Sequence, residues 1–460
     1  SSRTRRLVLQ ENVAAYAFLL LRLLYLAHYT QDEYGRLIII GVMAMFFAHI
    51  FEIIGGNGFK DKYQGKESGD YPFYKTSDIN GDCDYVSTSS NYVDADVVDI
   101  ENYNIVPVSS IVVSKIGAAM RKNHRKITTC DCCIDNNLQA LHPIRTIDDV
   151  KYLYYLLKVV NFEWFDNNGT IPSVNNAKLK DLYVPWVSLA EQQRISEFLD
   201  RKCAEVDEMI ALQEQIIEEL KAYKQSVITE AVTKGLNPDA PMRDSGIEWI
   251  GQIPEHWELK PLKFNFKRRS ERNNPIVTTE RLSLSIDKGV TLYSEKTTNL
   301  DRFKEDFTQY QIAHPNDIVL NCMNMIVGAV GLSKYLGCVS PVYYVIYPSN
   351  SKIDSEYYSY LLNTPTIRGV YYSYGKGIYA IERGEGRVNT CRLKVSYEDF
   401  GRFDIPIPPI EEQKDIVIYI KEKCADIDSL IQTKQSKIDS LKEYKKSIIY
   451  EYVTGKREVK

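Results

Sequence analysis

The stretch that decides the fold is Leu189–Gly235, LAEQQRISEFLDRKCAEVDEMIALQEQIIEELKAYKQSVITEAVTKG, because the chain contains it twice. When Ser188 is placed on Pro409, Ser188–Gly235 aligns with Pro409–Lys456 without a gap, and we call this displacement the repeat offset. Lys202-Cys203-Ala204 then meets Lys423-Cys424-Ala425. A long internal repeat is stronger evidence of architecture than any local motif. We therefore expect a chain built from two similar halves.

Both copies have the apolar spacing of an amphipathic helix. Apolar residues recur at steps of three and four residues, or at multiples of them, and so form one stripe on each helix. Proline precedes each copy and glycine follows it, as expected at helix ends. The stripe residues are Leu199, Cys203, Val206, Ile210, Ile217, Leu220 and Val227 in the first copy, and Ile420, Cys424, Ile427, Ile431, Ile438, Leu441 and Ile448 in the second.

The two stripes have two possible partners. Each helix could pack on its neighbouring domain, or the two helices could pack on one another, and the near-heptad spacing favours a mutual coiled coil. An antiparallel pair centred on Gln213 and Lys434 would bring Val206 near Leu441 and set a polar layer at the midpoint. A parallel pair would instead place both domains at the same end of the helix pair.

The bulk properties set the class of protein. A length of 460 residues predicts two or three domains. A net charge of −4 argues against a wholly basic nucleic-acid binder but permits local basic patches. Nine cysteines without a secretory signal indicate free thiols in a reducing compartment, so we expect a cytoplasmic protein.

Residues 1–53 differ in character from the rest of the chain. Ala14–Leu26 and Leu37–Ile50 are apolar runs, each shorter than a comfortable membrane span. The stretch Phe18–Ile54 resembles a fragment of the polytopic cell-elongation proteins of the rod-shape type. A buried helical pair and a fused gene end are both open alternatives, and we assign this segment no function.

The remaining sequence predicts an α+β protein in which the order of domain and helix occurs twice. In the first mixed domain, Tyr71–Asn80 is a strand entering a polar turn, Ile111–Ile116 is a strand and Asp149–Val160 is a helix. Tyr357–Leu362 matches Tyr152–Leu157 in kind and placement. The expected boundaries are 1–53 for the apolar segment, 54–186 for the first domain, 187–236 for the first helix, 237–253 for a linker, 254–408 for the second domain and 409–460 for the second helix.

This order of elements, together with several motifs, resembles the specificity subunit of type I restriction–modification systems. The motifs are Ile253-Pro-Glu-His-Trp-Glu-Leu-Lys260 at the start of the second half and Pro406-Ile-Pro-Pro-Ile-Glu-Glu-Gln413 before the second helix. Val184–Gln192 is a degraded counterpart of the second motif. Nothing in Asp32–Val42 matches the first motif, so the first domain lacks the usual lead-in.

The resemblance implies two target-recognition domains held apart by an antiparallel coiled coil, with an internal pseudo-twofold repeat. Each domain of such a subunit reads one half of a split DNA sequence. Partner subunits carry adenine methylation, with two methylation subunits expected, and a motor nuclease carries cleavage. The chain itself is then a non-catalytic DNA-recognition subunit that needs no cofactor.

The sequence lacks the motifs of the rival enzyme classes. Asn273-Asn274-Pro275-Ile276 is the nearest string to the Asn/Asp-Pro-Pro-aromatic turn of adenine methyltransferases, and no Gly-x-x-x-x-Gly-Lys phosphate loop occurs. Cys130-Asp131-Cys132-Cys133, flanked by His124 and His142, has no common zinc spacing, so we expect no metal. A self-contained DNA-modifying enzyme and an envelope protein anchored by residues 1–53 are the alternatives.

Basic clusters and polar loops supply the candidate DNA contacts. Clustered cations can neutralise phosphates, and polar side chains on neighbouring loops can read base edges. A merely solvated face is an equally good interpretation of any single cluster. The candidates are Lys75, Thr76, Ser77, Asn80, Lys115, Arg121, Lys122, Arg125 and Lys126 in the first domain, and Lys267, Arg268, Arg269, Arg272, Asn321, Asn324, Tyr374 and Lys376 in the second, with a looser group at Arg383, Arg387, Arg392 and Lys394.

Overall fold

The computed structural model describes residues 51–459 except 82, 145–148, 181, 183, 185–186, 287, 296–305, 379–381, 384–386 and 389–391. Residues 1–50 of the predicted apolar segment 1–53 therefore lie outside the described residues, whereas Phe51–Ile53 belong to strand β1, which pairs with β8 of the first domain. Within the described part of the chain, no helix is long and apolar enough to cross a membrane. The chain divides into two units, one of residues 1–211 and 438–460 and the other of residues 212–437.

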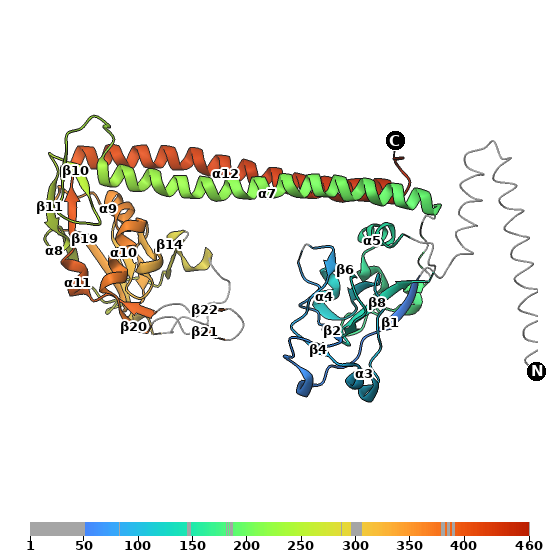
Figure 1. The fold of residues 1–460 in the computed structure, drawn as a ribbon. Coiled ribbons are helices and arrows are strands. Elements are labelled where there is room, and N and C mark those ends of the chain that lie inside the picture. The colour runs from blue at the N-terminus through green and yellow to red at the C-terminus, as the bar shows by residue number, and fades with distance from the viewer. Residues whose placement is uncertain are drawn as a thin grey trace, which may run out of the picture. The chain divides into compact units, whose positions relative to one another are not determined.

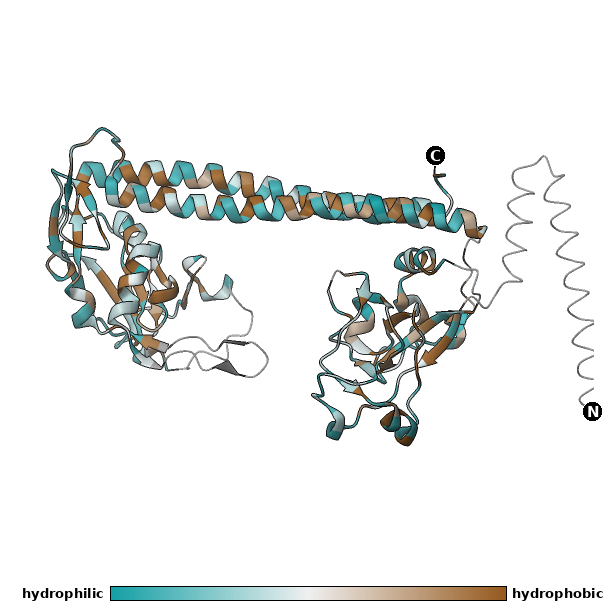
Figure 2. Cartoon of the chain, viewed as in Figure 1, coloured by the Kyte–Doolittle hydropathy of each residue, from teal (hydrophilic) through white to brown (hydrophobic). Residues whose placement is uncertain are grey.

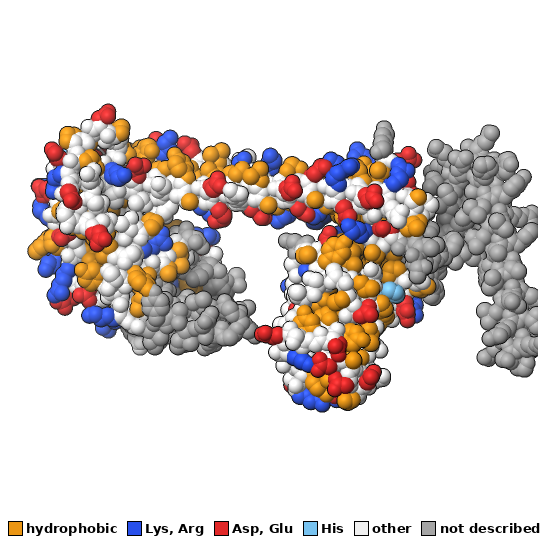
Figure 3. Space-filling model, viewed as in Figure 1, with side chains coloured by type: hydrophobic (Ala, Val, Ile, Leu, Met, Phe, Trp, Pro, Cys, Tyr) orange, Lys and Arg blue, Asp and Glu red, His pale blue; other side chains and the backbone are white. Residues whose placement is uncertain are grey.

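Two long helices match the repeated stretches. α7 spans Leu189–Lys234 and α12 spans Ile410–Val453, and Figure 1 shows each as one continuous helix. Figure 2 shows apolar residues recurring along both helices, and Figure 3 shows acidic and basic side chains interspersed on their exposed faces. The stripe residues Leu199, Val206 and Ile438 are each at most 2% exposed. The sequence prediction of two amphipathic helices is confirmed.

Cross-helix ion pairs show that the coiled coil is antiparallel, as expected. The Lys445 ammonium bonds both Asp207 carboxylate oxygens at 2.7 and 2.6 Å. The Lys224 ammonium bonds both Asp428 oxygens at 2.7 Å. The two pairs have the same sum of residue numbers, so both units have the same antiparallel register. The repeat offset converts one pair into the other, which is the internal pseudo-twofold symmetry.

The midpoint of the helix pair contains an unsatisfied polar group. Gln213 is only 6% exposed, and its Oε1 has no hydrogen-bond partner among the described residues. Lys434, its counterpart in the repeat, is half-buried. A polar side chain inside an apolar seam specifies register at a cost in stability.

The first domain is a mixed α+β domain built on two small sheets. One sheet has the order β1-β8-β5-β6-β3, in which β3 and β6 are parallel and the other neighbours antiparallel, and the second has the order β4-β2-β7. Helix α5 (Val150–Val159) closes the core with six consecutive buried residues. The other elements are β1 (Phe51–Gly55), β2 (Tyr71–Tyr74), β3 (Tyr85–Val86), β4 (Tyr92–Val93), α3 (Ala95–Glu101), β5 (Ile111–Ser114), α4 (Gly117–Arg121), β6 (Arg125–Thr128), β7 (Cys133–Ile134), β8 (Leu138–Pro143), α6 (Asn176–Lys180) and the 3-10 helices Asp61–Tyr63 and Phe162–Phe165.

The second domain is also a mixed α+β domain, with more strands in smaller sheets. Its four-stranded antiparallel sheet has the order β12-β19-β16-β17, and helices α9 (Ser355–Leu361) and α10 (Pro365–Tyr374) contribute to its main core. The other elements are β9 (Met242–Asp244), β10 (Gln252–Pro254), β11 (Glu258–Pro261), α8 (Leu262–Asn265), β12 (Phe266–Arg268), β13 (Leu282–Ser285), β14 (Gly289–Leu292), β15 (Gln311–Ala313), β16 (Ile318–Asn321), β17 (Val330–Leu332), β18 (Gly337–Val339), β19 (Tyr343–Pro348), β20 (Lys376–Ile378), β21 (Glu382–Arg383), β22 (Arg387–Val388), β23 (Arg392–Lys394), α11 (Tyr397–Gly401), β24 (Asp404–Ile407) and the 3-10 helices Tyr293–Glu295, Phe307–Gln309 and Met325–Val327.

In the second unit, α9 is fixed to the long helices by a buried glutamine and a buried tyrosine. Gln413 accepts a hydrogen bond from the Asp354 N–H at 2.8 Å and donates to the Lys352 and Pro408 carbonyls at 2.9 and 2.8 Å. Asp354 caps α9, and its side chain accepts from the Tyr357 N–H. The Tyr357 hydroxyl then donates to the Val232 carbonyl at 2.7 Å.

The first unit repeats this arrangement. Gln192 accepts from the Asp149 N–H at 3.0 Å and donates to the Val187 carbonyl at 3.0 Å. Asp149 caps α5, and the Tyr152 hydroxyl reaches the Val453 carbonyl at 3.5 Å. The repeat offset relates Gln192 to Gln413 and Val232 to Val453. A shorter displacement along the sequence relates the two caps to one another and the two tyrosines to one another. Each domain is therefore docked by equivalent residues, although the domains differ in length.

The lead-in motif of the second half covers the end of α7. The Trp257 indole donates to the Glu412 carboxylate at 3.1 Å, and the same oxygen bonds the His256 Nε2 at 2.8 Å. Gly235 has a φ of +77°, and a Cβ there would lie 2.9 Å from a Glu412 oxygen and 3.3 Å from the Trp257 ring. Only glycine fits this turn without strain.

Candidate nucleic-acid interface

In the second domain, the structure gathers several candidate residues around the loop that follows β16. Asn321 ends β16, and its side chain accepts a hydrogen bond from the Met323 N–H at 3.1 Å. The Val395 N–H donates to the Cys322 carbonyl, which places the loop beside β23. Strand β23 pairs with β20, so that Lys376 lies opposite Lys394. Lys376 and Lys394 are both exposed. Two cations therefore lie near the loop that carries Asn321 and Asn324.

Arg268 joins this group from β12, which β19 separates from β16 in the sheet. Its guanidinium carbon lies 5.1 Å from the ring centres of both Tyr344 and Tyr397. Burial raises the pKa of the Cys322 thiol, while the charges of Lys394 and Arg268 act against that rise, so both cations lie near the loop. We call Arg268, Asn321, Asn324, Lys376 and Lys394 the basic surface. It combines phosphate-type donors with amide groups that can read base edges.

Arg269 has a different environment from its neighbour Arg268. Its guanidinium makes two hydrogen bonds to the Asp317 carboxylate, at 2.6 and 2.9 Å, and it stacks on the Tyr347 ring. The Asp317 side chain is only 2% exposed. The bond to Asp317 raises the pKa of Arg269 above its ordinary value. Arg269 therefore balances a buried charge, and we do not count it among the proposed DNA contacts.

The other second-domain candidates are more scattered. Lys267 and Arg272 are exposed, and the Arg272 backbone forms a bridge with Gln311. Tyr374 ends α10 and packs its ring 5.0 Å from Phe403. The backbones of Arg383 and Arg387 face one another in the β21–β22 hairpin. Their side chains, and that of Arg392, lie outside the described residues.

In the first domain, the polar turn after β2 is formed as expected. The Asp78 N–H donates to the Lys75 carbonyl, and the Asn80 N–H donates to the Ser77 carbonyl. The Lys75 ammonium donates to Gln64 Oε1 at 2.8 Å. Ser77 and Asn80 are exposed and Thr76 is half-buried, and their contact with DNA stays a prediction.

The basic run 121–126 separates into an exposed half and a buried half. Arg121 ends α4, and Lys122 is its C-cap; both are exposed, and Arg121 lies 3.4 Å from Glu163. Arg125 and Lys126 lie in β6 and are 5% and 6% exposed. The Arg125 guanidinium donates to the Asn123 and Val160 carbonyls, and burial lowers its pKa to about 10. All four residues of β6 are buried, so Arg125 and Lys126 are not part of a solvated basic cluster. We therefore no longer count these two residues among the candidate DNA contacts.

Lys115 follows β5 and is half-buried. Its backbone N–H donates to the Asn137 carbonyl, and its carbonyl accepts from the Val174 N–H. The residue thus ties two loops together through its backbone, and a DNA contact of its ammonium remains a prediction.

The docking residues are the functional positions that sequence reasoning missed. Gln192 and Gln413 were visible as identical repeat positions, but their role needed the partner caps Asp149 and Asp354, which fall outside the aligned stretches. Among the described residues, no cluster of three or more His, Cys, Asp or Glu could hold a metal. Cys132 and Cys133 are buried and Cys130 is half-buried, all as free thiols.

Comparisons with known proteins give one consistent result. Residues 41–222 match the family profile described as the type I restriction modification DNA specificity domain. A putative type I restriction enzyme MjaX specificity subunit from Methanocaldococcus jannaschii is 24% identical over 344 residues, covering 70% of this chain and 72% of that protein. The EcoDI specificity subunit from Escherichia coli is 23% identical over 300 residues, covering 61% and 64%. A chain from a solved type I R-M system superposes with a TM-score of 0.57 at 13% identity, covering 84% of this chain and 91% of that one.

Proposed function

We infer that this chain, which belongs to the specificity subunits of type I restriction–modification systems, recognises a DNA target made of two half-sites. One recognition domain would read each half-site. The chain would direct partner subunits that methylate adenine and cleave DNA, and would itself carry no catalytic site. We place it in the cytoplasm, where DNA and those subunits are found.

The observation that carries this proposal is the repeated docking of two different domains on one antiparallel helix pair. Equivalent glutamine, cap and tyrosine residues hold both domains, while the strands and loops beyond the docking elements differ. A scaffold that is constant where it docks and variable elsewhere suits the reading of two unrelated short sequences. The comparisons favour this function over an anchored envelope protein and over a self-contained DNA-modifying enzyme.

In the second domain, the basic surface is the proposed contact with DNA. Arg268, Lys376 and Lys394 would bind phosphates, and Asn321 and Asn324 would read base edges. In the first domain, the turn Lys75–Asn80 and the exposed pair Arg121 and Lys122 would likewise contact phosphates and base edges. Arg268 lies over two tyrosine rings that contact one another. This contact restricts its side chain, which lowers the entropy lost on binding.

The test is to assemble the chain with the methylation subunits of its system and to sequence the methylated adenines. We expect one two-part target. Exchanging Asn321 and Asn324 for Ala should change the bases accepted in one half-site only. Lys263→Ala, at an exposed lysine on α8, is the control for loss of a positive charge. A complex that methylates without sequence preference would contradict the proposal.

A further inference from the structure

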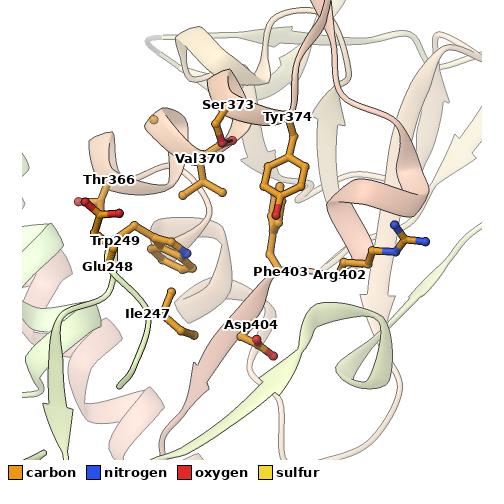
Figure 4. Close-up of a pocket in the computed structure, with 11 residues that line it drawn as sticks. Ile247, Glu248, Trp249, Thr366, Val370, Ser373, Tyr374, Arg402, Phe403 and Asp404 are labelled. Atoms are coloured by element: carbon orange, nitrogen blue, oxygen red, sulfur yellow. Dashed lines mark hydrogen bonds between the residues drawn. The ribbon is translucent and has the colours of Figure 1, made fainter. Parts of the chain in front are cut away.

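A pocket in the second unit has a composition unsuited to DNA. Figure 4 shows it between the stretch Ile247–Trp249, helix α10 and the start of β24. Its volume is about 560 Å³, within the range of ligand-sized pockets. Thr366, Val370 and Ser373 line it from one face of α10, and no lysine contributes to its lining.

The walls of the pocket are aromatic and apolar. Trp249 packs against the main core of the second unit, and Figure 4 shows its indole directed toward the centre of the pocket. Tyr374 and Phe403 form the facing wall with ring centres 5.0 Å apart. Tyr374 is 43% exposed, so part of its ring is available to a guest. Such rings attract a cation placed over their faces.

The rim of the pocket is acidic. Glu248 and Asp404 line it, and neither carboxylate has a cation partner among the residues that the structure describes. The one lining cation, Arg402, bonds Glu398 at 2.6 Å, and Figure 4 shows its guanidinium pointing away from the centre. Two uncompensated carboxylates repel phosphate but complement a basic side chain.

We propose that this pocket binds an arginine side chain of a protein subunit that assembles with the chain. The aromatic walls would stack on the planar guanidinium, and Glu248 and Asp404 would accept its hydrogen bonds. This inference rests on the proposed function because it identifies a protein-facing surface on the same subunit. DNA is excluded as the occupant by the sign of the rim charges.

The pocket belongs to one half of the repeat. The repeat offset places Leu26-Ala27-His28 opposite Ile247-Glu248-Trp249, and that stretch lacks both the acid and the tryptophan. Under the repeat offset, the first half of the sequence therefore offers no equivalent of Glu248 and Trp249. The chain should take one such arginine, even where two copies of a partner subunit bind the symmetric helix pair.

The first experiment observes the indole N–H signals of the full chain labelled with ¹⁵N-tryptophan. The Trp249 signal is assigned with Trp249→Phe. An acetylated Gly-Arg-Gly amide is titrated as the probe, and a Gly-Gln-Gly amide is the matched control. We expect the arginine peptide alone to shift the Trp249 signal, and we expect Glu248→Gln with Asp404→Asn to weaken that binding by about tenfold or more.

Glu255→Gln with Asp239→Asn removes two exposed acids outside the pocket and should leave the titration unchanged. Equal shifts from both peptides, no shift, or a shift that persists in the Glu248→Gln, Asp404→Asn variant would each overturn the proposal. A DNA duplex that moves the Trp249 signal would also overturn it. DNA binding by the assembled complex is measured separately, so loss of the pocket inference leaves the DNA-recognition proposal to its own test.

Discussion

The same substitution, glutamine to leucine, should have opposite effects at two positions of the helix pair. Gln413 is fully buried and makes three hydrogen bonds, whereas the Oε1 of the buried Gln213 has no partner among the described residues. Leucine has a similar volume, so neither change opens a large cavity. The sign of the effect then depends on the polar groups left behind.

Gln413→Leu leaves the Asp354 N–H and the Lys352 and Pro408 carbonyls without their partner. Each lost bond to a neutral group costs about 1 kcal/mol, so the free energy of unfolding should fall by about 3 kcal/mol. Gln192→Leu breaks the two equivalent bonds and should cost about 2 kcal/mol. Gln213→Leu removes an unsatisfied carbonyl from an apolar seam and should gain about 1 kcal/mol.

Guanidinium unfolding followed by far-UV circular dichroism measures these differences for the full chain. Amide hydrogen exchange gives a local measurement, because the Asp354 N–H should lose protection in Gln413→Leu and keep it in Gln213→Leu. A stabilised Gln413→Leu variant would refute the docking role. A Gln213→Leu variant destabilised as much as Gln413→Leu would show that the central glutamine is satisfied.

Three further predictions follow from ion pairs and buried charges. Arg268→Ala should reduce the slope of the logarithm of the DNA-binding constant against the logarithm of salt concentration by about one, as a salt titration would measure. Arg269→Ala should instead lower the free energy of unfolding by about 3 kcal/mol, because it leaves the buried Asp317 without its partner; denaturant unfolding measures this loss. Lys151 pairs with Asp200, and the corresponding pair of the second unit, Glu356 with Lys421, has the charges exchanged. Lys151→Glu should lower the free energy of unfolding by less than about 1 kcal/mol, and the double variant with Asp200→Lys should recover that loss. Burial alone would raise the pKa of Asp84, but Lys158 and Tyr154 outweigh it and hold the pKa below its usual range. The resulting stabilisation is present above about pH 4 and is lost as the pH falls through the lowered pKa. In Lys158→Met, acid unfolding should therefore show a smaller loss of stability over this pH range.

The sequence predicted the elements that repeat, and the structure shows why. The stripes of α7 and α12 lie on helices of 46 and 44 residues, so their period was clear. The predicted helix Asp149–Val160 exceeds α5 by one capping residue at each end. Short strands such as β21 and β22, with two residues each, carry no detectable period. Side-chain placement was the weakest part of the prediction. Arg125 and Lys126 belong to a strand buried on both faces, which a run of charges conceals.

The sequence could propose contact residues only where polar side chains gather in a predicted loop. Asn321 ends β16 and Asn324 lies in the loop after it, both half-buried, and their contact with DNA stays a prediction. Arg268 and Arg269 are adjacent and chemically identical, yet one stacks on two tyrosines and the other bonds Asp317. Asp317 lies 48 residues away from Arg269. A contact at that separation depends on strand pairing, which no local pattern specifies.

The spacing of the docking residues suggests how such a chain can change its target. The cap and the glutamine that holds it are 43 residues apart in the first unit and 59 residues apart in the second. That difference leaves the geometry of the glutamine, cap and tyrosine contacts intact in both units. In the second unit the longer segment contains β20 and β23, which carry Lys376 and Lys394 of the basic surface.

The segment between the docking helix and the following long helix therefore differs between the two units, while the docking contacts are the same in kind. The docking contacts need only a few fixed positions, because the cap accepts from a backbone N–H and the tyrosine donates to a backbone carbonyl. Backbone groups are present whatever side chains surround them. We expect a domain with a new reading surface to dock on the same glutamine and valine if it keeps the aspartate cap, the tyrosine three residues later and the apolar residues that pack on the long helices.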